Sequence, residues 1–294
     1  MNTQKENLLV GSRVILCKIH RIFFDHSFKD MEIEWAIFTG SAGPSMTDLE
    51  KLGEISYSEF QYFPQPTVDG HAGVIQIMRH PSKENRAVLI FQGRKHFYEC
   101  ENIQEVVFFA RLAVSMWIKN IIFTNAAGAL EANDAGKIMV INDTGKSDLM
   151  NPLLGQGGDM SLFKNSRFLS TTQLLDLKFI DLATDILHKE FRDDSALSGP
   201  YHANTGPDYE SRIEVERLRK QEFRAVGMST VPDLLAAKSM DKRVRLAAFS
   251  MLTNACIGWE EESEDEPNHE DVMKVSKERD DVFSKFITRF LVEA

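Results

Sequence analysis

The sequence contains few of the features that mark secreted or membrane-bound proteins. Its three cysteines, Cys17, Cys100 and Cys256, are odd in number and scattered over 294 residues. This spacing fits neither a disulfide framework nor a metal site, and predicts free thiols in a reducing cytosol. No apolar run approaches membrane-spanning length, and charged residues interrupt the apolar residues near the N-terminus, unlike a secretory signal. We therefore expect a cytoplasmic protein that does not bind membranes.

Positive charge is also scarce. The 34 lysines and arginines are outnumbered by 44 aspartates and glutamates, which gives a net charge of -10 at pH 7. Nucleic-acid-binding proteins normally present a basic face, so we expect no nucleic-acid partner. A small anion needs only a local cluster of cations and is not excluded. The acidic run Glu260–Glu266 lacks histidines and is interpreted as a solvated loop rather than a metal site.

Apolar residues make up 43% of the chain, which is enough for a large core. We expect a single domain over residues 1–294, in which residues 1–32 form a helical extension. Strands alternate with helices, which predicts an α/β layer fold with a mixed sheet. The expected strands are Trp35–Thr39, Gly73–Met78, Ala87–Gln92, Asn120–Thr124, Lys137–Asn142, Ala225–Ser229 and Val244–Thr253. The expected helices are Ile103–Ile118, Thr172–Phe191, Ser211–Lys220, Pro232–Ser239 and Glu270–Val292. Asn268 is expected to cap the last of these helices. The segment Asp143–Ser170 is expected to be an irregular connection.

The segment Phe91-Gln-Gly-Arg-Lys-His-Phe-Tyr-Glu99 follows a predicted buried strand and carries the strongest chemical signal. Arg94, His96 and Tyr98 are spaced by two, so in an extended segment they share one face. The guanidinium fork of arginine matches the oxygens of a phosphate, and histidine shares charge with an anion near neutral pH. The pattern indicates an anion site at a sheet edge, or alternatively a basic surface strand with scattered aromatics.

Small residues follow two other predicted strands. The segment Phe38-Thr-Gly-Ser-Ala-Gly-Pro-Ser45 can turn backbone amides and a hydroxyl toward an anion, although it matches neither a dinucleotide fingerprint nor a P-loop. The segment Phe123-Thr-Asn-Ala-Ala-Gly-Ala129 allows a ligand, or a packed neighbouring element, to approach the backbone closely. Glu210 and Met228 stand at boundaries between later predicted elements. Glu210 suits either a ligand site or the N-terminus of a helix. Met228 suits either a ligand site or the core.

Taken in order along the chain, these segments resemble the trimeric, low-molecular-mass purine nucleoside phosphorylases. The resemblance runs from about Trp35 to the C-terminus. It implies a three-layer α/β/α fold with a mixed, twisted central β-sheet, a homotrimer, and a role in purine salvage. Family members cleave the glycosidic bond of a purine nucleoside with inorganic phosphate as co-substrate and need no cofactor or metal. The motifs are the Gly40-Ser41 loop, Gly70-His-Ala-Gly73, Gln92–Glu99, Thr124-Asn-Ala-Ala-Gly128, Gly206-Pro-Asp-Tyr-Glu210, Val226-Gly-Met-Ser-Thr-Val-Pro232, Thr253-Asn254 and Asn268-His-Glu270.

The resemblance also implies a role for individual residues. His96, Glu210, Asn254 and His269 are the implied catalytic residues, and Glu99 is implied to position its neighbours. The implied phosphate site comprises Ser41, His71, Arg94, His96, the Ala126 amide and Ser229. The implied ribose site comprises Tyr98, Met228, His269 and, from an adjacent subunit, Phe163. The implied purine site comprises Tyr209, Glu210, Val226 and Asn254.

Breaking the glycosidic bond makes the sugar oxocarbenium-like and moves negative charge onto the purine. The resemblance implies that phosphate supplies the anion below the sugar, that Asn254 donates to the purine, and that Glu210 accepts from the ring N–H of a 6-oxopurine. These contacts strengthen as charge develops and therefore favour the transition state. This pair of residues favours inosine and guanosine over adenosine.

Two departures from the family pattern keep alternatives open. The glycine-serine loop contains Pro44, which fixes a backbone angle and removes an amide donor. Ala255 stands where mammalian-type members have lysine. A methylthioadenosine phosphorylase is one alternative, although that family uses carboxylates in place of Asn254. A catalytically silent nucleoside-binding homologue is the other, favoured only by the altered loop.

Overall fold

The computed structural model describes residues 3–25, 30–40, 43–68, 70–154, 168–191, 196–258 and 268–294. The strands are β1 (Glu32–Thr39), β2 (Lys51–Ser56), β3 (Val74–Arg79), β4 (Arg86–Gln92), β5 (Asn120–Ala129), β6 (Ile138–Lys146), β7 (Ala196–Ala203), β8 (Ala225–Gly227) and β9 (Arg245–Ala255). The helices are α1 (Thr3–Asp25), α2 (Phe97–Cys100), α3 (Ile103–Val106), α4 (Phe108–Ser115), α5 (Leu177–Glu190), α6 (Arg212–Lys220), α7 (Val231–Met240) and α8 (His269–Glu293). None of the helices in these ranges is long and apolar enough to cross a membrane.

Within the described residues, the strands form one mixed sheet in the order β2-β3-β4-β1-β5-β8-β7-β6-β9. Strand β9 pairs with β5 as well as with β6, so β5, β8, β7, β6 and β9 close into a ring. Strands β4, β1, β5 and β9 run parallel to one another. Their carboxyl ends therefore meet at one edge, the usual place for a ligand in such sheets.

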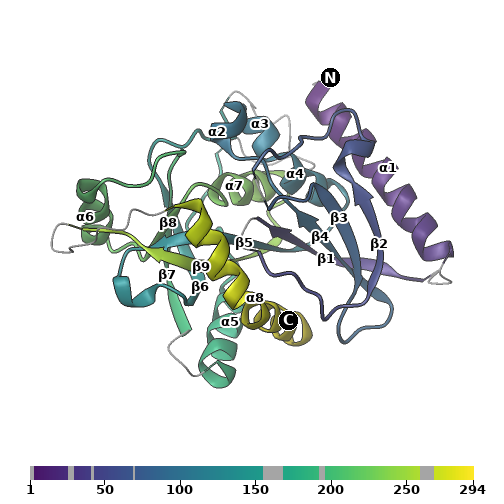
Figure 1. Cartoon of the computed structure of the whole chain (residues 1–294). Coiled ribbons are helices and arrows are strands. Elements are labelled where there is room, and N and C mark those ends of the chain that lie inside the picture. The colour runs from purple at the N-terminus through teal and green to yellow at the C-terminus, as the bar shows by residue number, and fades with distance from the viewer. Residues whose placement is uncertain are drawn as a thin grey trace.

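Helices cover both faces of the sheet, as Figure 1 shows for α4 and α7 on one side and α5 and α8 on the other. Side chains along a strand alternate between the two faces. In β1, Ala36 and Phe38 join the core under α1, α4 and α7, whereas Trp35 and Ile37 join the core under α5 and α8. The predicted three-layer α/β/α fold with a mixed central sheet is confirmed.

Helix boundaries follow local capping chemistry. The Asn268 side chain accepts a hydrogen bond from the amide of Asp271 at 2.9 Å, which confirms the predicted cap of α8. The Ser211 and Glu214 side chains form a capping box at α6, so Glu210 stands just before the helix and not in its first turn. Helix α1 lies within the region expected to be a helical extension, and its Ile15, Ile19 and Phe23 enter the main core.

Several predicted elements are wrong in extent. Strands β2 and β7 were not predicted, and β6 continues to Lys146 into the segment expected to be irregular. The expected helix Ile103–Ile118 is two helices, α3 and α4, because Val107 leaves the helical conformation between them. Trp117, with a φ of 67°, turns the chain after α4 has ended. The acidic run Glu260–Glu266 lies within residues 259–267, outside the described part of the chain.

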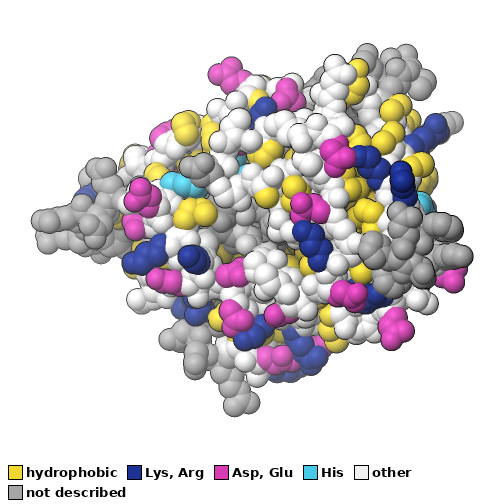
Figure 2. Space-filling model, turned by 45° about the vertical axis from the view of Figure 1, so that its right-hand side comes forward, with side chains coloured by type: hydrophobic (Ala, Val, Ile, Leu, Met, Phe, Trp, Pro, Cys, Tyr) yellow, Lys and Arg dark blue, Asp and Glu magenta, His cyan; other side chains and the backbone are white. Residues whose placement is uncertain are grey.

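The surface carries charges of both signs. On the face shown in Figure 2, basic and acidic side chains are interspersed over the described residues rather than gathered by sign. Some form exposed pairs along a helix, such as Lys285 with Asp281 at 2.6 Å in α8. Exposed pairs of this kind contribute little to stability, and they also neutralise one another locally.

Candidate functional site

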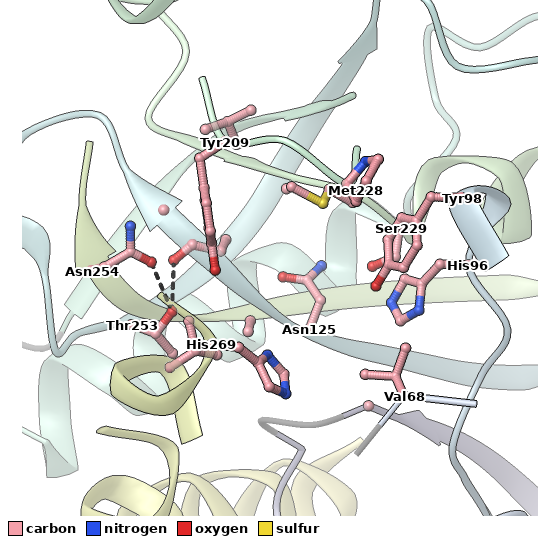
Figure 3. Close-up of a pocket in the computed structure, with 18 of the residues that line it drawn as sticks. Val68, His96, Tyr98, Asn125, Tyr209, Met228, Ser229, Thr253, Asn254 and His269 are labelled. Atoms are coloured by element: carbon pink, nitrogen blue, oxygen red, sulfur yellow. Dashed lines mark hydrogen bonds between the residues drawn. The ribbon is translucent and has the colours of Figure 1, made fainter. Parts of the chain in front are cut away.

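A cavity of about 380 Å³ opens at the carboxyl ends of the parallel strands, and Figure 3 shows side chains from widely separated segments pointing into it. The structure brings most of the predicted site residues together in its wall. They are Arg94, His96, Tyr98, Ala126, Tyr209, Glu210, Val226, Met228, Ser229, Asn254 and His269. His71 is not among the lining residues, but its ring centroid lies 5.3 Å from that of His96. The predicted residues Ser41 and Phe163 lie outside the described residues.

The predicted extended arrangement of Arg94, His96 and Tyr98 is wrong. Strand β4 ends at Gln92, and Gly93 has a φ of 100°, a left-handed conformation that favours glycine. His96 then precedes the short helix α2, which contains Tyr98. The His96 and Tyr98 rings stack with centroids 4.9 Å apart and planes 9° from parallel. The residues thus reach one cavity through a turn and a helix rather than through strand alternation.

Arg94 is almost fully buried, with 6% of its surface exposed. Its terminal nitrogens donate to Thr230 Oγ1 at 3.2 Å, to the Phe38 carbonyl at 3.3 Å and to the Thr124 carbonyl. A Cβ atom added to Gly40 would lie 3.6 Å from Arg94 Nε, so this edge of the guanidinium faces the loop after β1. The protein therefore fixes the cation in the wall of the cavity, with Nε toward the loop after β1.

The carboxylate of Asp233 lies behind Arg94, with Oδ2 3.9 Å from Nη1. Burial raises the pKa of Asp233 to about 7, against the attraction of Arg94 and Arg111. Burial in turn lowers the pKa of Arg94, and Asp233 acts in the opposite direction. Arginine nevertheless stays protonated in proteins, so Arg94 brings a positive charge to this end of the cavity.

His71 is held by the backbone of Arg94. Its Nδ1 lies 3.0 Å from the Arg94 amide nitrogen and 2.7 Å from the Arg94 carbonyl oxygen. Burial, helped by the nearby His96 and Arg94, lowers the pKa of His71 to about 4. Its Nε2 is buried without a partner among the described residues, and lies 3.4 Å from a Cβ atom added to Gly40. A neutral ring therefore directs a free nitrogen at the same loop as Arg94.

His96 is oriented by Glu99. The carboxylate oxygen Oε1 accepts hydrogen bonds from the His96 amide at 2.6 Å and from His96 Nδ1 at 2.9 Å. Its other oxygen accepts from the Thr67 amide and hydroxyl at 2.8 and 2.6 Å. Burial alone would raise the pKa of Glu99, but these bonds lower it to about 2. Burial lowers the pKa of His96, and Glu99 opposes that change.

A hydroxyl network joins Arg94 to the start of α7. Thr230 Oγ1 accepts from Arg94 and from Asn125 Nδ2 at 2.8 Å, and lies 3.3 Å from Ser229 Oγ. Thr230 has a φ of 71°, a strained conformation that such bonds can hold in place. Ser229 lines the cavity just before the N-terminus of α7, where the helix dipole favours anions.

At the opposite end of the cavity, Asn254 is oriented by its neighbour (Figure 3). Its Oδ1 lies 3.1 Å from the hydroxyl of Thr253, which also lies 3.4 Å from the Ala127 carbonyl. A hydroxyl donating to Oδ1 leaves Nδ2 as the donor for a ligand. A Cβ atom on Gly128 would lie 2.5 Å from Cys256 Sγ and 3.5 Å from Asn254 Nδ2, so glycine is needed beside this amide.

Glu210 and Tyr209 close the same end. Glu210 Oε1 accepts a hydrogen bond from Asn204 Nδ2 at 2.8 Å. Burial raises the pKa of Glu210, although the bond from Asn204 lowers it. Tyr209 keeps 39% of its surface exposed, and its ring stands across the cavity in Figure 3. This end therefore offers an amide donor, a carboxylate acceptor and a flat aromatic wall.

Met228 and His269, the first residue of α8, lie toward the middle of the cavity, and Tyr98 lies beside His96 (Figure 3). Gly206 has a φ of 71°, and a Cβ atom there would lie 3.0 Å from both Met228 Cγ and Tyr98 Cδ1. The turn at Gly206 therefore brings a soft apolar side chain and a phenol close together. Such a surface suits the two faces of a sugar ring, apolar on one side and hydroxylated on the other.

Some contributors were not predicted from sequence. Asn125, Thr230, Asp233 and Thr253 orient the predicted residues, and Val68 and Val272 complete the wall. Asn125, Thr230 and Thr253 lie within motifs that carry the family resemblance, and this was the available sequence signal for them. In the described part of the chain, no group of three or more histidines, cysteines and carboxylates is arranged to hold a metal ion. The expectation that no cofactor is needed stays a prediction.

Comparison with known proteins agrees with this geometry. A family model described as the phosphorylase superfamily matches residues 32–292. Purine nucleoside phosphorylase 1 of Geobacillus stearothermophilus is 31% identical over 256 residues, covering 85% of this chain and 87% of that protein. The Bos taurus purine nucleoside phosphorylase is 32% identical over 261 residues, covering 86% of each. The crystal structure of Schistosoma mansoni purine nucleoside phosphorylase in complex with adenosine superposes with a TM-score of 0.78 at 25% identity, covering 92% of this chain and 94% of that one. The chain therefore belongs to the phosphorylase superfamily, and within it to the purine nucleoside phosphorylases.

Proposed function

We propose that this chain catalyses the phosphorolysis of 6-oxopurine nucleosides such as inosine and guanosine. An oxygen of inorganic phosphate forms a bond to C1′ of the sugar as the bond from C1′ to the purine nitrogen breaks. The electron pair of the broken bond goes to the purine, which leaves as the free base after taking up a proton, and the sugar leaves as a 1-phosphate. The observation that carries the proposal is one cavity with anion-binding groups at one end and an amide–carboxylate pair at the other.

The phosphate would lie between Arg94, His96, the Ala126 amide and Ser229. Arg94 supplies charge, and Ser229 supplies a hydroxyl just before the N-terminus of α7, where the helix dipole favours an anion. When His71 Nδ1 accepts from the Arg94 amide, its Nε2 carries the hydrogen and can donate to the anion. The role that the resemblance implies for Ser41 stays a prediction, as does the influence of Pro44. Further along the same loop, Ser45 Oγ is bound to Asp280 of α8 at 2.6 Å.

The sugar would lie over Met228 between Tyr98 and His269. Positioning phosphate below C1′ converts an encounter of two molecules into an oriented reaction, an effect that can reach several kcal/mol. The phosphate dianion also stabilises the positive charge that develops on the sugar ring. The contribution of Phe163 from an adjacent subunit, the homotrimer and the cytoplasmic location stay predictions.

The purine would lie beside Val226 and Tyr209, with Asn254 and Glu210 in its plane. Asn254 donates to the purine as negative charge accumulates on it, and Glu210 accepts from the N1–H of a 6-oxopurine. Adenine has no hydrogen at N1, so it leaves the carboxylate oxygen that Asn204 does not contact without a partner, which is costly in a buried site. The S. mansoni relative is described in complex with adenosine. The fold alone therefore does not select the base, and the preference for 6-oxopurines rests on this pair of side chains.

Turnover of inosine, guanosine, adenosine and methylthioadenosine, each with and without phosphate, tests the proposal. We expect phosphate-dependent release of hypoxanthine and guanine, and much slower release of adenine from either adenine nucleoside. Preferred cleavage of methylthioadenosine would favour the alternative phosphorylase. Nucleoside binding without release of any base would indicate a catalytically silent homologue.

A further inference from the structure

The side chain of Asn204 makes a contact with the base-reading carboxylate that the proposed chemistry does not use. Its Nδ2 donates to Glu210 Oε1 at 2.8 Å, and only the amide nitrogen of asparagine can donate to a carboxylate. The Asn204 backbone follows β7 and is itself fixed, because its amide donates to the Gly227 carbonyl of β8 at 2.8 Å. Asn204 is therefore a firmly placed donor rather than a mobile surface side chain.

Asn204 reaches Glu210 from outside the nucleoside cavity. It lines a second, smaller cavity of about 150 Å³, whose wall also includes Ser147, Asp148 and Arg217. Glu210 lines both cavities and so forms part of the partition between them. Asn204 thus donates a hydrogen bond to one oxygen of the carboxylate from the side of the second cavity, while the base would approach from the nucleoside cavity.

We propose that Asn204 is a positioning and specificity-determining residue that reserves Glu210 Oε1 and leaves Oε2 for the base. One free oxygen matches a purine that offers one donor on this edge, the N1–H of hypoxanthine. Guanine offers a second donor, its 2-amino group, which meets an oxygen already engaged by Asn204. The preferred substrate class is therefore 6-oxopurine nucleosides without a 2-amino group. This inference rests on the proposed function.

Replacing Asn204 with valine tests the inference, because valine fills similar space and donates no hydrogen bond. The variant leaves the buried Oε1 without a partner when inosine is bound, whereas the 2-amino group of guanosine can replace the lost donor. We expect the ratio of kcat/KM for guanosine to that for inosine to rise on the order of threefold to tenfold, the usual effect of one hydrogen bond. We expect the loss with inosine to appear mainly in its KM.

Ser147→Ala is the matched control, since Ser147 lines the same small cavity and its Oγ lies 2.7 Å from His202 Nε2 rather than near Glu210. It should leave the ratio unchanged. If Asn204→Val does not fold, Asn204→Ala, which only enlarges an existing cavity, provides the same comparison.

The outcomes separate this inference from the proposed function. A wild-type protein that releases base from neither nucleoside in phosphate contradicts the proposed function. An active wild-type protein whose ratio is unchanged by both Asn204 variants, or moves toward inosine, overturns the role of Asn204 and leaves the proposed function standing. A merely structural defect lowers both activities together and so also leaves the ratio unchanged.

Discussion

Glu99 holds His96 at two points, since one carboxylate oxygen accepts both the His96 backbone N–H at 2.6 Å and the ring Nδ1–H at 2.9 Å. A ring fixed through Nδ1 keeps Nε2 as the nitrogen available to a ligand. The other oxygen of Glu99 ties this arrangement to Thr67. Because the pKa of Glu99 is lowered to about 2, the carboxylate stays ionised throughout the neutral range.

Replacing His96 with alanine should impair phosphate use and leave the fold intact. His96 lies at the cavity wall at the start of a short helix, so its removal leaves the two main cores unchanged. We expect a rise in phosphate KM or a fall in kcat of about tenfold or more, within the range for a charge-assisted hydrogen bond. Initial rates at varied phosphate, together with circular dichroism, check this. Wild-type phosphorolysis in the variant would remove His96 from the site.

The Asn254→Asp variant should shift the base preference toward adenosine. A carboxylate at this position accepts from the 6-amino group of adenine, whereas it repels the 6-oxygen of hypoxanthine. We expect the ratio of kcat/KM for inosine to that for adenosine to fall by at least about tenfold, as expected when a hydrogen bond is exchanged for repulsion in a buried site. An unchanged ratio would show that Asn254 does not read the base.

Asp233 should make stability depend on pH. The folded state keeps the proton of Asp233 up to about pH 7, whereas the unfolded chain releases it near the ordinary pKa of 3.8. This raised pKa therefore contributes stability that is fully present below pH 3.8 and is lost as the pH rises to 7. The neutral variant Asp233→Asn removes that decline, at most about 1.4 kcal/mol per pH unit.

Urea unfolding of both proteins at several pH values between about 4 and 8 measures this effect. The difference in unfolding free energy, wild type minus variant, should fall with rising pH and level off above 7, since Asp233 is then ionised in both states. A difference that is flat, or that rises over the same range, would contradict the raised pKa.

Thr230 should matter through its hydroxyl. Thr230→Val keeps the β-branched shape but leaves the buried donors of Arg94 and Asn125 without their shared acceptor. We expect a loss of about 1–3 kcal/mol in unfolding free energy and a higher phosphate KM. Thr230→Ser keeps the oxygen and serves as the control, with phosphate KM close to wild type. Equal phosphate KM values in the two variants would show that the hydroxyl does not organise the site.

Most strands of the central sheet could be predicted from the sequence, but β2 and β7 could not. The segment that becomes β7 contains Gly199 and Pro200, which usually indicate a turn. In the structure, Pro200 pairs with Asp143 next to a register shift, where the ladder tolerates a missing amide. Strand β2 is an edge strand with alternating exposed residues and a glycine, Gly53, so its apolar signal is weak.

The motifs contain most of the side chains that line the cavity, but spacing alone predicts their geometry poorly. Arg94, His96 and Tyr98 converge because Gly93 ends the strand and Glu99 folds the chain back onto His96, not because they alternate along a strand. No local sequence pattern predicts the contacts that orient these side chains. Asn204 and Glu210 are joined across a turn, and Arg94 meets Asp233 across a large separation in sequence.

The most direct test of the central claim is the initial rate of hypoxanthine release from inosine as phosphate is increased from zero. We expect negligible release without phosphate, a rate that saturates with phosphate, and one ribose 1-phosphate formed for each hypoxanthine. Release at the same rate without phosphate, yielding free ribose, would show that water rather than phosphate attacks the sugar and would contradict the account.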